Sequence, residues 1–446
     1  MAATRASHAR EGASPTNPSD ARSSAHTERL DGRRVRRLLA INLGASVAFT
    51  AMYSTQAILP QIGQEFGVSP AQAGLTLSAV TLALAFASLA AGRLTDRLGS
   101  RRVMLVCSAA LAVLSAAVAL APTFPALVGL RALQGAVVPG ITVAGLAFLH
   151  NDLPAAWRGR VSGFYIAANT IGGLVGRLGV GLSVEIIGWR GGLGLVALLA
   201  AGGTTTLALG MPRGIPRTGA ADETRGEAGG EAALVAAPEA VAGAGAGASL
   251  WAVARRLWWA PLLGGTVFFP FLTLFTYTPY RLESPPFNLS AGATSLIYLV
   301  YLLGAVASPL AGQISDRIGR RPTILAALAL TALGLLLATV DALAVAALAL
   351  AVVCVGSLMA HVVANASTSD GANALGPRAR ATALSLYTFG FYIGGGLGAF
   401  IPGIGWERYR WPGVLVPCAV ALLLAALFAL RTPARPLRRT PGPIHT

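Results

Sequence analysis

The chain has 446 residues, of which 54% are hydrophobic and only 12% are charged, and its mean hydropathy is +0.64. A soluble domain carries about 25% charged residues, so this chain cannot cover a water-facing surface and most of it must lie in lipid. The formal net charge of +16 comes from arginine, because the sequence contains no lysine. The arginines gather in the tails and short loops, without the basic stripe and interleaved aromatic residues of a nucleic-acid surface, so nucleic acid is excluded as a partner.

Twelve apolar stretches of about 18 to 26 residues follow one another, each long enough to cross a bilayer core of about 30 Å. About 37 polar residues precede the first stretch, which is too many for a secretory signal peptide. The predicted membrane spans are 38–60, 71–91, 103–121, 124–149, 157–182, 189–211, 257–280, 291–311, 322–340, 343–367, 380–402 and 412–431. The three cysteines lie inside these spans without CxxC spacing, so we expect neither a disulfide nor a metal site there.

The spans divide the chain into two halves. Residues 38–211 and 251–431 each hold six spans, and the Gly-, Ala- and Glu-rich segment 212–250 between them has the composition of a disordered cytoplasmic linker. Residues 1–37 and 432–446 are predicted to be unstructured cytoplasmic tails. The expected fold is therefore an all-α membrane protein with 12 transmembrane helices in two bundles.

The distribution of arginine predicts the topology. Arginines occupy both tails and the loops after the second, fourth, eighth and tenth spans, whereas loops on the other side are nearly free of them, apart from 403–411. By the positive-inside rule both termini are cytoplasmic. We expect a multi-pass protein of the bacterial inner membrane.

An internal repeat relates the two halves. The segment GRLTDRLGSRR at 92–102 follows the second span, and GQISDRIGRR at 312–321 follows the eighth, 220 residues later. The pair Arg158 and Arg160, which opens the fifth span, has its counterpart in Arg378 and Arg380 at the same offset. Two features with one offset indicate a duplication into pseudo-symmetric halves, and such repeats place a substrate site near the membrane midplane.

The repeated pattern Gly-x-x-x-Asp-Arg-x-Gly-x-Arg-Arg resembles the signature loop of the major facilitator superfamily, over roughly residues 38–431. This resemblance implies two six-helix bundles around a central cavity that opens alternately to each side. It also implies a gating role for the residues of the two loops, namely Gly92, Asp96, Arg97, Gly99, Arg101, Gly312, Asp316, Arg317, Gly319 and Arg320.

The loops also have a physical rationale. Gly92 and Gly312 would let a helix end approach its neighbour closely. Each loop aspartate would face a helix N-terminus of the opposite half, where unpaired N–H groups attract an anion. Asp96 would lie near Arg378 on the eleventh span and Asp316 near Arg158 on the fifth, which would hold the cytoplasmic side shut. The alternative is simple positive-inside anchoring.

A second resemblance lies in the fourth span. Arg131 and Gln134 belong to an Arg-x-x-Gln-Gly element like that of proton-linked members of the superfamily, and the corresponding position of the second half is Ala351. A buried arginine costs roughly 2.5–3.5 kcal/mol at a helix centre on insertion scales, so we expect it to have a function. The alternative is that Arg131 extends outward from near the helix end.

The fifth span is rich in glycine, at 163, 172, 173, 176, 179 and 181. This spacing resembles the glycine-rich element of superfamily exporters, but Arg177 stands where proline is usual. The departure points away from drug–proton antiporters and towards a branch of arabinose-efflux-like exporters.

None of the eighteen acidic residues lies well within a predicted span. Exporters of cationic compounds commonly use a buried acid, because a lone cation is costly in a low dielectric. This chain offers Arg131 and Arg177 instead, both in the outer half of the membrane by count. An anionic or hydroxyl-rich substrate therefore fits better than a cation.

Polar faces on several spans are candidates for coupling or substrate contact. In the tenth span His361 could carry a coupling proton, because its pKa lies near neutrality, or could simply bond a neighbouring helix. Its face also bears Asn365, at helical spacing. The remaining candidates, which could equally be helix-packing residues, are Tyr53 and Gln56 in the first span, Tyr165 and Asn169 in the fifth, and Tyr277 in the seventh.

These features favour an exporter driven by proton antiport. The alternatives are a proton-coupled uptake symporter for a small nutrient and a non-transporting membrane sensor. The sequence shows no metal-ligand cluster, nucleophile triad or ATP-binding loop, so we expect no enzyme activity and no cofactor. The expected partners are a small-molecule substrate, protons and membrane lipid, and a monomer satisfies the fold.

Overall fold

The structure, a computed structural model, describes residues 31–153, 155–211, 250–373 and 375–432. This part of the chain forms helices and no strands. The N-terminal half contains α2 (Gly32–Tyr53), η1 (Gln56–Ile58), α3 (Leu59–Phe66), α4 (Pro70–Leu98), α5 (Ser100–Ala119), α6 (Phe124–Asp152) and α7 (Ala155–Gly210). The C-terminal half contains α8 (Leu250–Arg256), α9 (Trp259–Leu282), α10 (Ala291–Ser295), η4 (Leu296–Val300), α11 (Tyr301–Ile318), α12 (Arg320–Leu337), α13 (Leu343–Asn373) and α14 (Pro377–Ala429).

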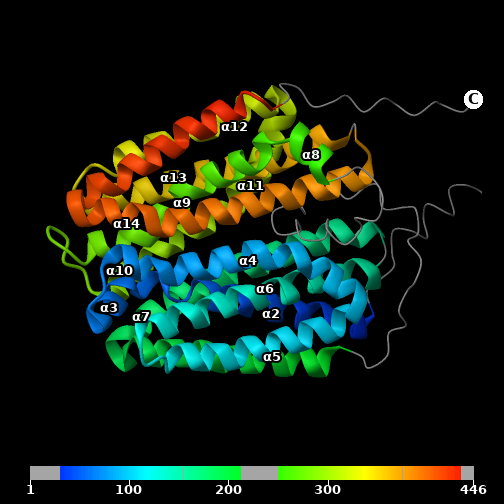
Figure 1. Cartoon of the computed structure of the whole chain (residues 1–446), viewed down its shortest axis with the longest axis horizontal. Coiled ribbons are helices and arrows are strands. Elements are labelled where there is room, and N and C mark those ends of the chain that lie inside the picture. Colours follow the sequence, from blue (N-terminus) through cyan, green and yellow to red (C-terminus); the bar gives the residue numbers. More distant parts are fainter. Residues whose placement is uncertain (1–30, 154, 212–249, 374, 433–446) are drawn as a thin grey trace, which may run out of the picture.

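The two halves lie one above the other, with their long helices roughly parallel (Figure 1). We call the end where α7 finishes and α8 begins the linker end, and the end that carries α3 and α10 the distal end. Within the halves α2 packs along α7, and α9 packs along α14. Between the halves, α4 packs on α14 and α7 packs on α10.

Ten helices in the described residues are long and apolar enough to cross a membrane. Two of them, α7 and α14, are double-length and contain one residue each with non-helical dihedral angles, Gly188 and Arg410. Each of these breaks separates two predicted spans, so the ten helices correspond to the twelve predicted spans. The all-helical fold is confirmed.

The helix boundaries differ from the predicted ones in three places. The helix α2 starts at Gly32, inside the segment predicted to be an unstructured tail, and α8 starts at Leu250, the last residue of the predicted linker. The first span breaks after Tyr53 into η1 and α3, a break that apolar patterning does not reveal. The rest of the predicted tails and linker, 1–30, 212–249 and 433–446, lies outside the described residues.

The duplication is visible in the backbone. Gly99 and Gly319 each end one helix and start the next, with φ of 84° and 96°, values that favour glycine. Each donates its N–H to the carbonyl four residues earlier, Thr95 or Ser315, at 2.9 Å. The second glycine of the repeated motif is therefore required by a sharp helix-to-helix turn.

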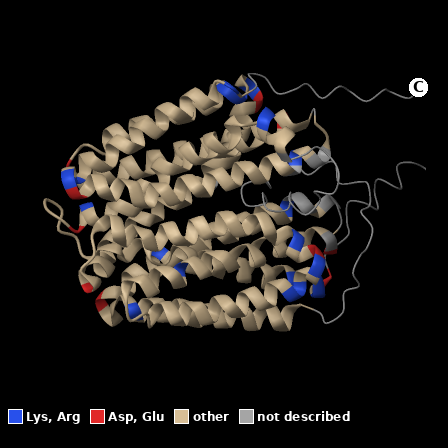
Figure 2. Ribbon diagram, viewed as in Figure 1, with Lys and Arg blue, Asp and Glu red and all other residues tan. Residues whose placement is uncertain are grey.

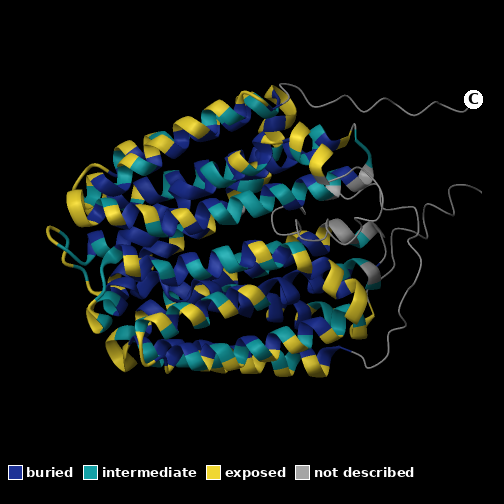
Figure 3. Cartoon of the chain, in the orientation of Figure 1, coloured by how far each residue is buried: buried dark blue, intermediate teal, exposed yellow. Residues whose placement is uncertain are grey.

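The surface matches a membrane environment. Large apolar side chains lie exposed along the outer sides of both halves, among them Ile186, Leu120, Leu209 and Val113 at 84%, 78%, 74% and 70% exposure. Figure 3 shows exposed positions on the outer helices around a buried interior. Charged residues gather at the two ends of the helices and are sparse between them (Figure 2). Lipid therefore covers the apolar sides.

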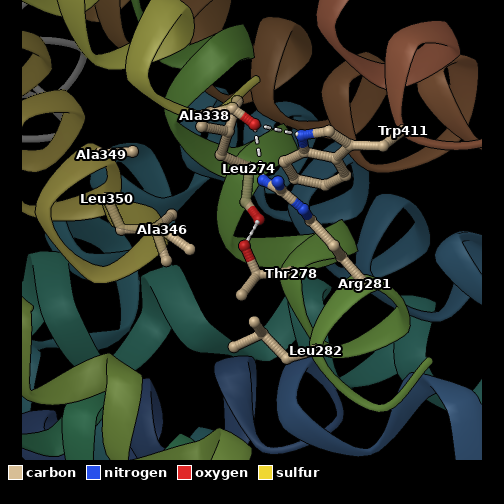
Figure 4. Close-up of a pocket in the computed structure, with 9 residues that line it drawn as sticks. All are labelled: Leu274, Thr278, Arg281, Leu282, Ala338, Ala346, Ala349, Leu350 and Trp411. Atoms are coloured by element: carbon tan, nitrogen blue, oxygen red, sulfur yellow. Dashed lines mark hydrogen bonds between the residues drawn. The ribbon is translucent and has the colours of Figure 1, made fainter. Parts of the chain in front are cut away.

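An arginine stabilises the distal end of the C-terminal half. Arg281 lies over the ring of Trp411, 4.6 Å from its centroid, and donates to the carbonyls of Ala338 and Val340 at 2.6 and 2.8 Å. It also pairs with Asp341 at 2.9 Å. Figure 4 shows Arg281 and Trp411 meeting at the carbonyl of Ala338, beside a small pocket lined mostly by apolar side chains. This pocket belongs to the C-terminal half alone.

The N-terminal half has the matching arrangement. Arg190 lies 4.5 Å from the ring centroid of Trp189 and donates to the carbonyls of Ala119 and Ala121, both at 2.9 Å. Its acidic partner is Glu65, at 2.7 Å. Both arginines therefore hold the loop between the third and fourth spans of their half, although they come from different helices.

Candidate functional site

Arg131 is completely buried inside the N-terminal half. Its Nη1 donates to the carbonyl of Ala51 at 2.8 Å and to Gln134 Oε1 at 2.7 Å, and its Nη2 donates to the carbonyl of Met52. Nε donates to the carbonyl of Thr76 at 3.1 Å. The guanidinium group therefore joins α2, α4 and α6.

These contacts explain why the charge is tolerated. The helix α2 ends at Tyr53, which leaves carbonyls of its last turn without helical partners, and a cation at a helix C-terminus also favours the helix dipole. Gln134 is itself held, because its Nε2 donates to Ser115 Oγ at 3.0 Å. Arg131 and Gln134 thus stabilise the break in the first span, and each of these contacts stays inside one half.

Arg177 is equally buried, at 1% exposure, but it connects both halves. Its Nε donates to Gln56 Oε1 at 2.6 Å, Nη1 to the carbonyl of Gly173 at 2.8 Å, and Nη2 to the hydroxyl of Tyr301, in the C-terminal half, at 2.9 Å. The guanidinium carbon lies 3.8 Å from the ring centroid of Tyr53 and 4.3 Å from that of Tyr301. None of these partners is a carboxylate.

Glycines of the fifth span make room for this arrangement. A Cβ atom at Gly172 would lie 2.0 Å from the carbonyl oxygen of Ser46, and one at Gly176 would lie 2.3 Å from that of Thr50, so α7 can approach α2 closely only with glycine there. A Cβ at Gly173 would lie 3.0 Å from Nη1 of Arg177. The glycine run therefore positions the guanidinium group against its own helix.

Gln56 extends the contact across the molecule. Its Nε2 donates to Thr276 Oγ1 at 2.9 Å, and the two residues are 220 positions apart, which is the offset of the repeat. A residue can meet its own counterpart only near the pseudo-two-fold axis that relates the halves. Gln56, Thr276 and the neighbouring Arg177 therefore lie close to this axis.

Further contacts join the halves towards the distal end. Tyr280 donates its hydroxyl to the carbonyl of Leu59 at 3.0 Å, and Ser78 donates to that of Gly396 at 2.6 Å. The backbone N–H of Gly292 donates to Glu185 Oε1 at 3.0 Å. We call this set, together with Gln56–Thr276, Gln61–Glu283 and Arg177–Tyr301, the distal interface.

Glu283, just beyond the end of α9, is the carboxyl group of this interface whose pKa burial raises. Its Oε2 accepts a hydrogen bond of 2.8 Å from Gln61 Nε2, whereas its buried Oε1 has no partner. Burial raises the pKa of Glu283 to about 7, and the hydrogen bond from Gln61 acts in the opposite direction. Opening the interface would expose this carboxyl group to water.

A chain of aromatic rings leads from Arg177 into the C-terminal half. The ring of Tyr301 lies 4.6 Å from that of Phe275, which lies 5.0 Å from that of Phe271. Phe268 continues the chain, 5.7 Å from Phe271 and 3.8 Å from Phe391. The site therefore has a long aromatic lining on one side.

His361 stands at the other end of this chain. Its ring centroid lies 4.2 Å from that of Phe391, and its Nδ1 lies 3.0 Å from the hydroxyl of Tyr387 on α14. The interhelical hydrogen bond considered from the sequence is therefore present, and a coupling role for His361 stays a prediction. Asn365, one turn further along α13, is also buried.

Three other candidates differ in whether their polar side-chain atoms have hydrogen-bond partners. Tyr165 donates to the carbonyl of Thr142 at 2.8 Å, and Tyr277 donates to that of Ala399 at 2.7 Å, so both hydroxyls hold helices of their own half together. Asn169 is different, because its side chain is 1% exposed and neither its Oδ1 nor its Nδ2 has a hydrogen-bond partner.

The predicted contact between Asp316 and Arg158 stays a prediction, because the side chain of Arg158 lies outside the described residues. The side chain of Asp316 is 75% exposed, and its ion pair with Arg320, at 4.0 Å, is made on the linker-end turn of its own half. A Cβ added at Gly312 would meet no described atom within 4 Å. The gating role of the second repeated loop stays a prediction.

Other residues of the two loops make contacts within their own halves. Arg101 Nε donates to the carbonyl of Met211 at 3.4 Å, and Arg320 Nε donates to Asp370 Oδ2 at 3.1 Å. Gly92 is buried, whereas Asp96, Arg97 and Arg317 are exposed. The side chains of Arg158 and Arg378 lie outside the described residues, so the predicted contact between Asp96 and the eleventh span stays a prediction.

Comparison with known proteins identifies the family to which this architecture belongs. The profile of the Major Facilitator Superfamily matches residues 41–284 and again 283–445. The chain belongs to this superfamily. It is therefore a multi-pass membrane transporter and not an enzyme, as predicted, with a small-molecule substrate and a lipid environment.

Individual relatives and a solved structure support this family assignment. The chain is 29% identical over 402 residues to the inner membrane transport protein YnfM of Escherichia coli, covering 88% of this chain and 89% of that protein. It is 33% identical over 187 residues to the tetracenomycin C resistance and export protein of Streptomyces glaucescens, covering 38% and 33%. A solved structure of a bacterial homologue of the human lysosomal transporter Spinster matches with a TM-score of 0.71 at 16% identity, over 90% of this chain and 97% of that one.

Sequence reasoning missed several residues of the distal interface, namely Tyr301, Thr276 and the pair Gln61 and Glu283. A signal for Thr276 was available, because the repeat offset maps it onto Gln56. Tyr301 offered no such signal, because its counterpart under the same offset is Thr81 and nothing sets it apart from other polar residues of its span, such as Ser295 and Tyr298.

Proposed function

We propose that the protein is a secondary active exporter that moves a small molecule across the bacterial inner membrane by proton antiport and alternating access. The two halves would rock about the pseudo-two-fold axis, with both termini and the linker end in the cytoplasm. Positive charge at the linker end, on Arg33, Arg97, Arg102 and other exposed arginines, supports that orientation.

The observation that carries the proposal is a difference in contacts between the distal end and the linker end. Hydrogen bonds of the distal interface close the outer side, while Asp316, the predicted latch residue of the inner side, is exposed to solvent. Alternating access requires such an asymmetry, with each set of contacts breaking when the other forms. Within this proposal we assign the structure to the inward-facing state of the cycle.

Export rather than import is supported by the fifth span. Its glycines permit the close packing of α7 on α2 that the exporter-like element implies. The resemblance over part of the chain to a named export protein agrees with this direction.

The direction of transport can be tested in everted membrane vesicles with a panel of organic acids, sugars and antibiotics. An exporter accumulates its substrate in everted vesicles when respiration acidifies the lumen, and the substrate in turn dissipates the pH gradient. Accumulation only in right-side-out vesicles would instead establish the uptake symporter. His361→Gln should abolish the pH-gradient dependence if His361 carries the coupling proton, whereas unchanged dependence would leave it a packing residue.

A further inference from the structure

Arg177 is a buried cation without an anion. Among the described residues its partners are an amide, a backbone carbonyl, a phenol hydroxyl and two aromatic faces, and no ion pair joins it to a carboxylate. A charge removed from water is expensive unless an opposite charge approaches it. The surroundings of Arg177 therefore favour an anion over any other ligand.

The hydrogen bonds of the guanidinium group are made to neutral partners. Arginine has five N–H groups, and three of them are used by Gln56, Gly173 and Tyr301. The side chain of Tyr53 also interacts with the guanidinium group, and the planar guanidinium fork matches a carboxylate that displaces its neutral partners.

The backbone contact of Arg177 lies on its linker-end side. Nη1 contacts the carbonyl of Gly173, one helical turn nearer to that end, as expected for a side chain that leans towards its helix N-terminus. Asn169 follows one further turn along the same face, and both its amide atoms lack partners although the side chain is 1% exposed. Arg177 and a side chain with unused hydrogen-bonding capacity thus share one stripe of α7.

Aromatic rings accompany this stripe. Tyr53 and Tyr301 lie on the guanidinium group, and the ring chain continues from Tyr301 through Phe275 and Phe271. A flat apolar body would pack against such rings, with its charged end at the arginine.

We infer that Arg177 recognises the carboxylate of an aromatic acid that enters from the linker end, and that this carboxylate displaces Tyr301 and Gln56 from the guanidinium group. The displacement frees the contacts that Arg177 and Gln56 make with the C-terminal half, so substrate binding itself opens the distal interface. This inference rests on the proposed function, whose substrate class it names.

The test uses the purified full-length chain in nanodiscs, with its three native cysteines replaced by alanine and spin labels on Gln64→Cys and Arg408→Cys. Both positions are exposed at the distal end, one in each half. The probes are benzoate, its neutral analogue benzamide, and arabinose as a neutral hydroxyl-rich compound. Benzoate should lengthen the inter-label distance, whereas benzamide and arabinose should not.

Two variants assign the response to Arg177. Arg177→Gln should weaken benzoate binding by roughly tenfold or more, because charge-assisted hydrogen bonds are lost. Arg190→Gln is the matched control, since it removes a cation from the same helix that is already paired with Glu65, and it should keep the response. If Arg177→Gln does not fold, Tyr301→Phe decides, because it keeps the ring and should raise the open population without any ligand.

An equal response to benzoate and benzamide, opening by arabinose, or a full benzoate response in Arg177→Gln would overturn the inference. So would an unchanged open population in Tyr301→Phe. The assay uses no gradient, so it is independent of direction and proton coupling. An importer would still give the expected response to benzoate. An exporter of neutral compounds would not give this response, although it would still accumulate its substrate in everted vesicles.

Discussion

The two buried arginines of the N-terminal half have opposite relations to the rest of the molecule. Arg131 contacts carbonyls of Ala51, Met52 and Thr76 and the amide of Gln134, all in its own half. Arg177 shares its donors between its own half and Tyr301 of the other. Both are fully desolvated, so burial alone does not distinguish a structural arginine from a functional one.

The location of their hydrogen-bond partners distinguishes the two arginines. Contacts within one rigid bundle need never break during a transport cycle, whereas a contact between the bundles must break each time the distal end opens. We therefore assign Arg131 to stability and Arg177 to conformational change. The following predictions test this division.

Arg131→Met should have the largest effect on stability. It leaves the carbonyls of the last turn of α2 and the amide of Gln134 without their buried partner, so the free energy of unfolding should fall by about 2–4 kcal/mol. Thermal unfolding in detergent would measure this loss. Arg408→Gln, at an exposed position, is the control and should change stability little. An Arg131→Met variant as stable as this control would contradict the assignment.

Gly172→Ala should come next. The added Cβ would meet the backbone oxygen of Ser46 at 2.0 Å, which forces α7 away from α2 and costs about 1–3 kcal/mol. Gly179→Ala, on the same helix, is the matched control because its Cβ would meet nothing within 4 Å. Comparable melting temperatures for the two variants would show that the glycine run has no packing role.

Thr276→Val should have a smaller effect, on conformation rather than on stability. It removes the acceptor of the hydrogen bond from Gln56 across the axis, worth about 1 kcal/mol, and should raise the distal-open population roughly fivefold. Thr278→Val removes a hydroxyl that, like that of Thr276, bonds the carbonyl four residues earlier, but Thr278 has no described partner in the other half. The distance between labels at Gln64 and Arg408 should respond to the first variant only.

Glu283→Gln should mainly alter the pH dependence. Burial in the closed distal interface raises the pKa of Glu283 to about 7, whereas in an open, hydrated interface it should titrate near its ordinary value of 4.5. The closed state thus binds the proton more tightly, so the stabilisation of closure by Glu283 is complete below pH about 4.5 and is lost as the pH rises through 7. The open population should therefore grow between about pH 5 and 8 in the wild type.

The glutamine variant should lack this pH response and stay near the low-pH population, since its side chain cannot ionise. Tyr280 and Tyr298 are the titratable groups that interact electrostatically with Glu283, and phenols remain neutral over this range. A wild-type curve that is flat from pH 5 to 8 would exclude Glu283 as the responsive group.

Much of the fold could be predicted from the sequence, because in lipid the length of an apolar run determines whether it spans. The duplicated loops then indicate which spans of one half correspond to which spans of the other. Apolar patterning does not predict the break after Tyr53. Pro60, in the first turn of α3, favours the start of a new helix there, and a tertiary contact stabilises the break. Arg131, in the fourth span, binds the carbonyls that the break leaves open.

The site was predicted less completely. Arg177, Gln56 and Tyr53 were singled out as polar residues in apolar spans, and the structure brings them together. Their partner Tyr301 and the carboxyl group of Glu283 depend on how the halves dock, which the composition of a single span does not encode. The predicted contacts of Asp96 and Asp316 with the opposite half stay predictions, because the side chains of Arg378 and Arg158 lie outside the described residues.

The most direct test of the central claim is to prevent the distal interface from opening. Gln61→Cys and Glu283→Cys replace two side chains that meet between the halves, and a short reducible thiol cross-linker would join them. The account predicts that cross-linking stops export of the compound found in the vesicle screen, that reduction restores it, and that cross-linking Arg37→Cys to Asp152→Cys, within one half, has no effect. Continued export through a cross-linked distal interface would contradict it.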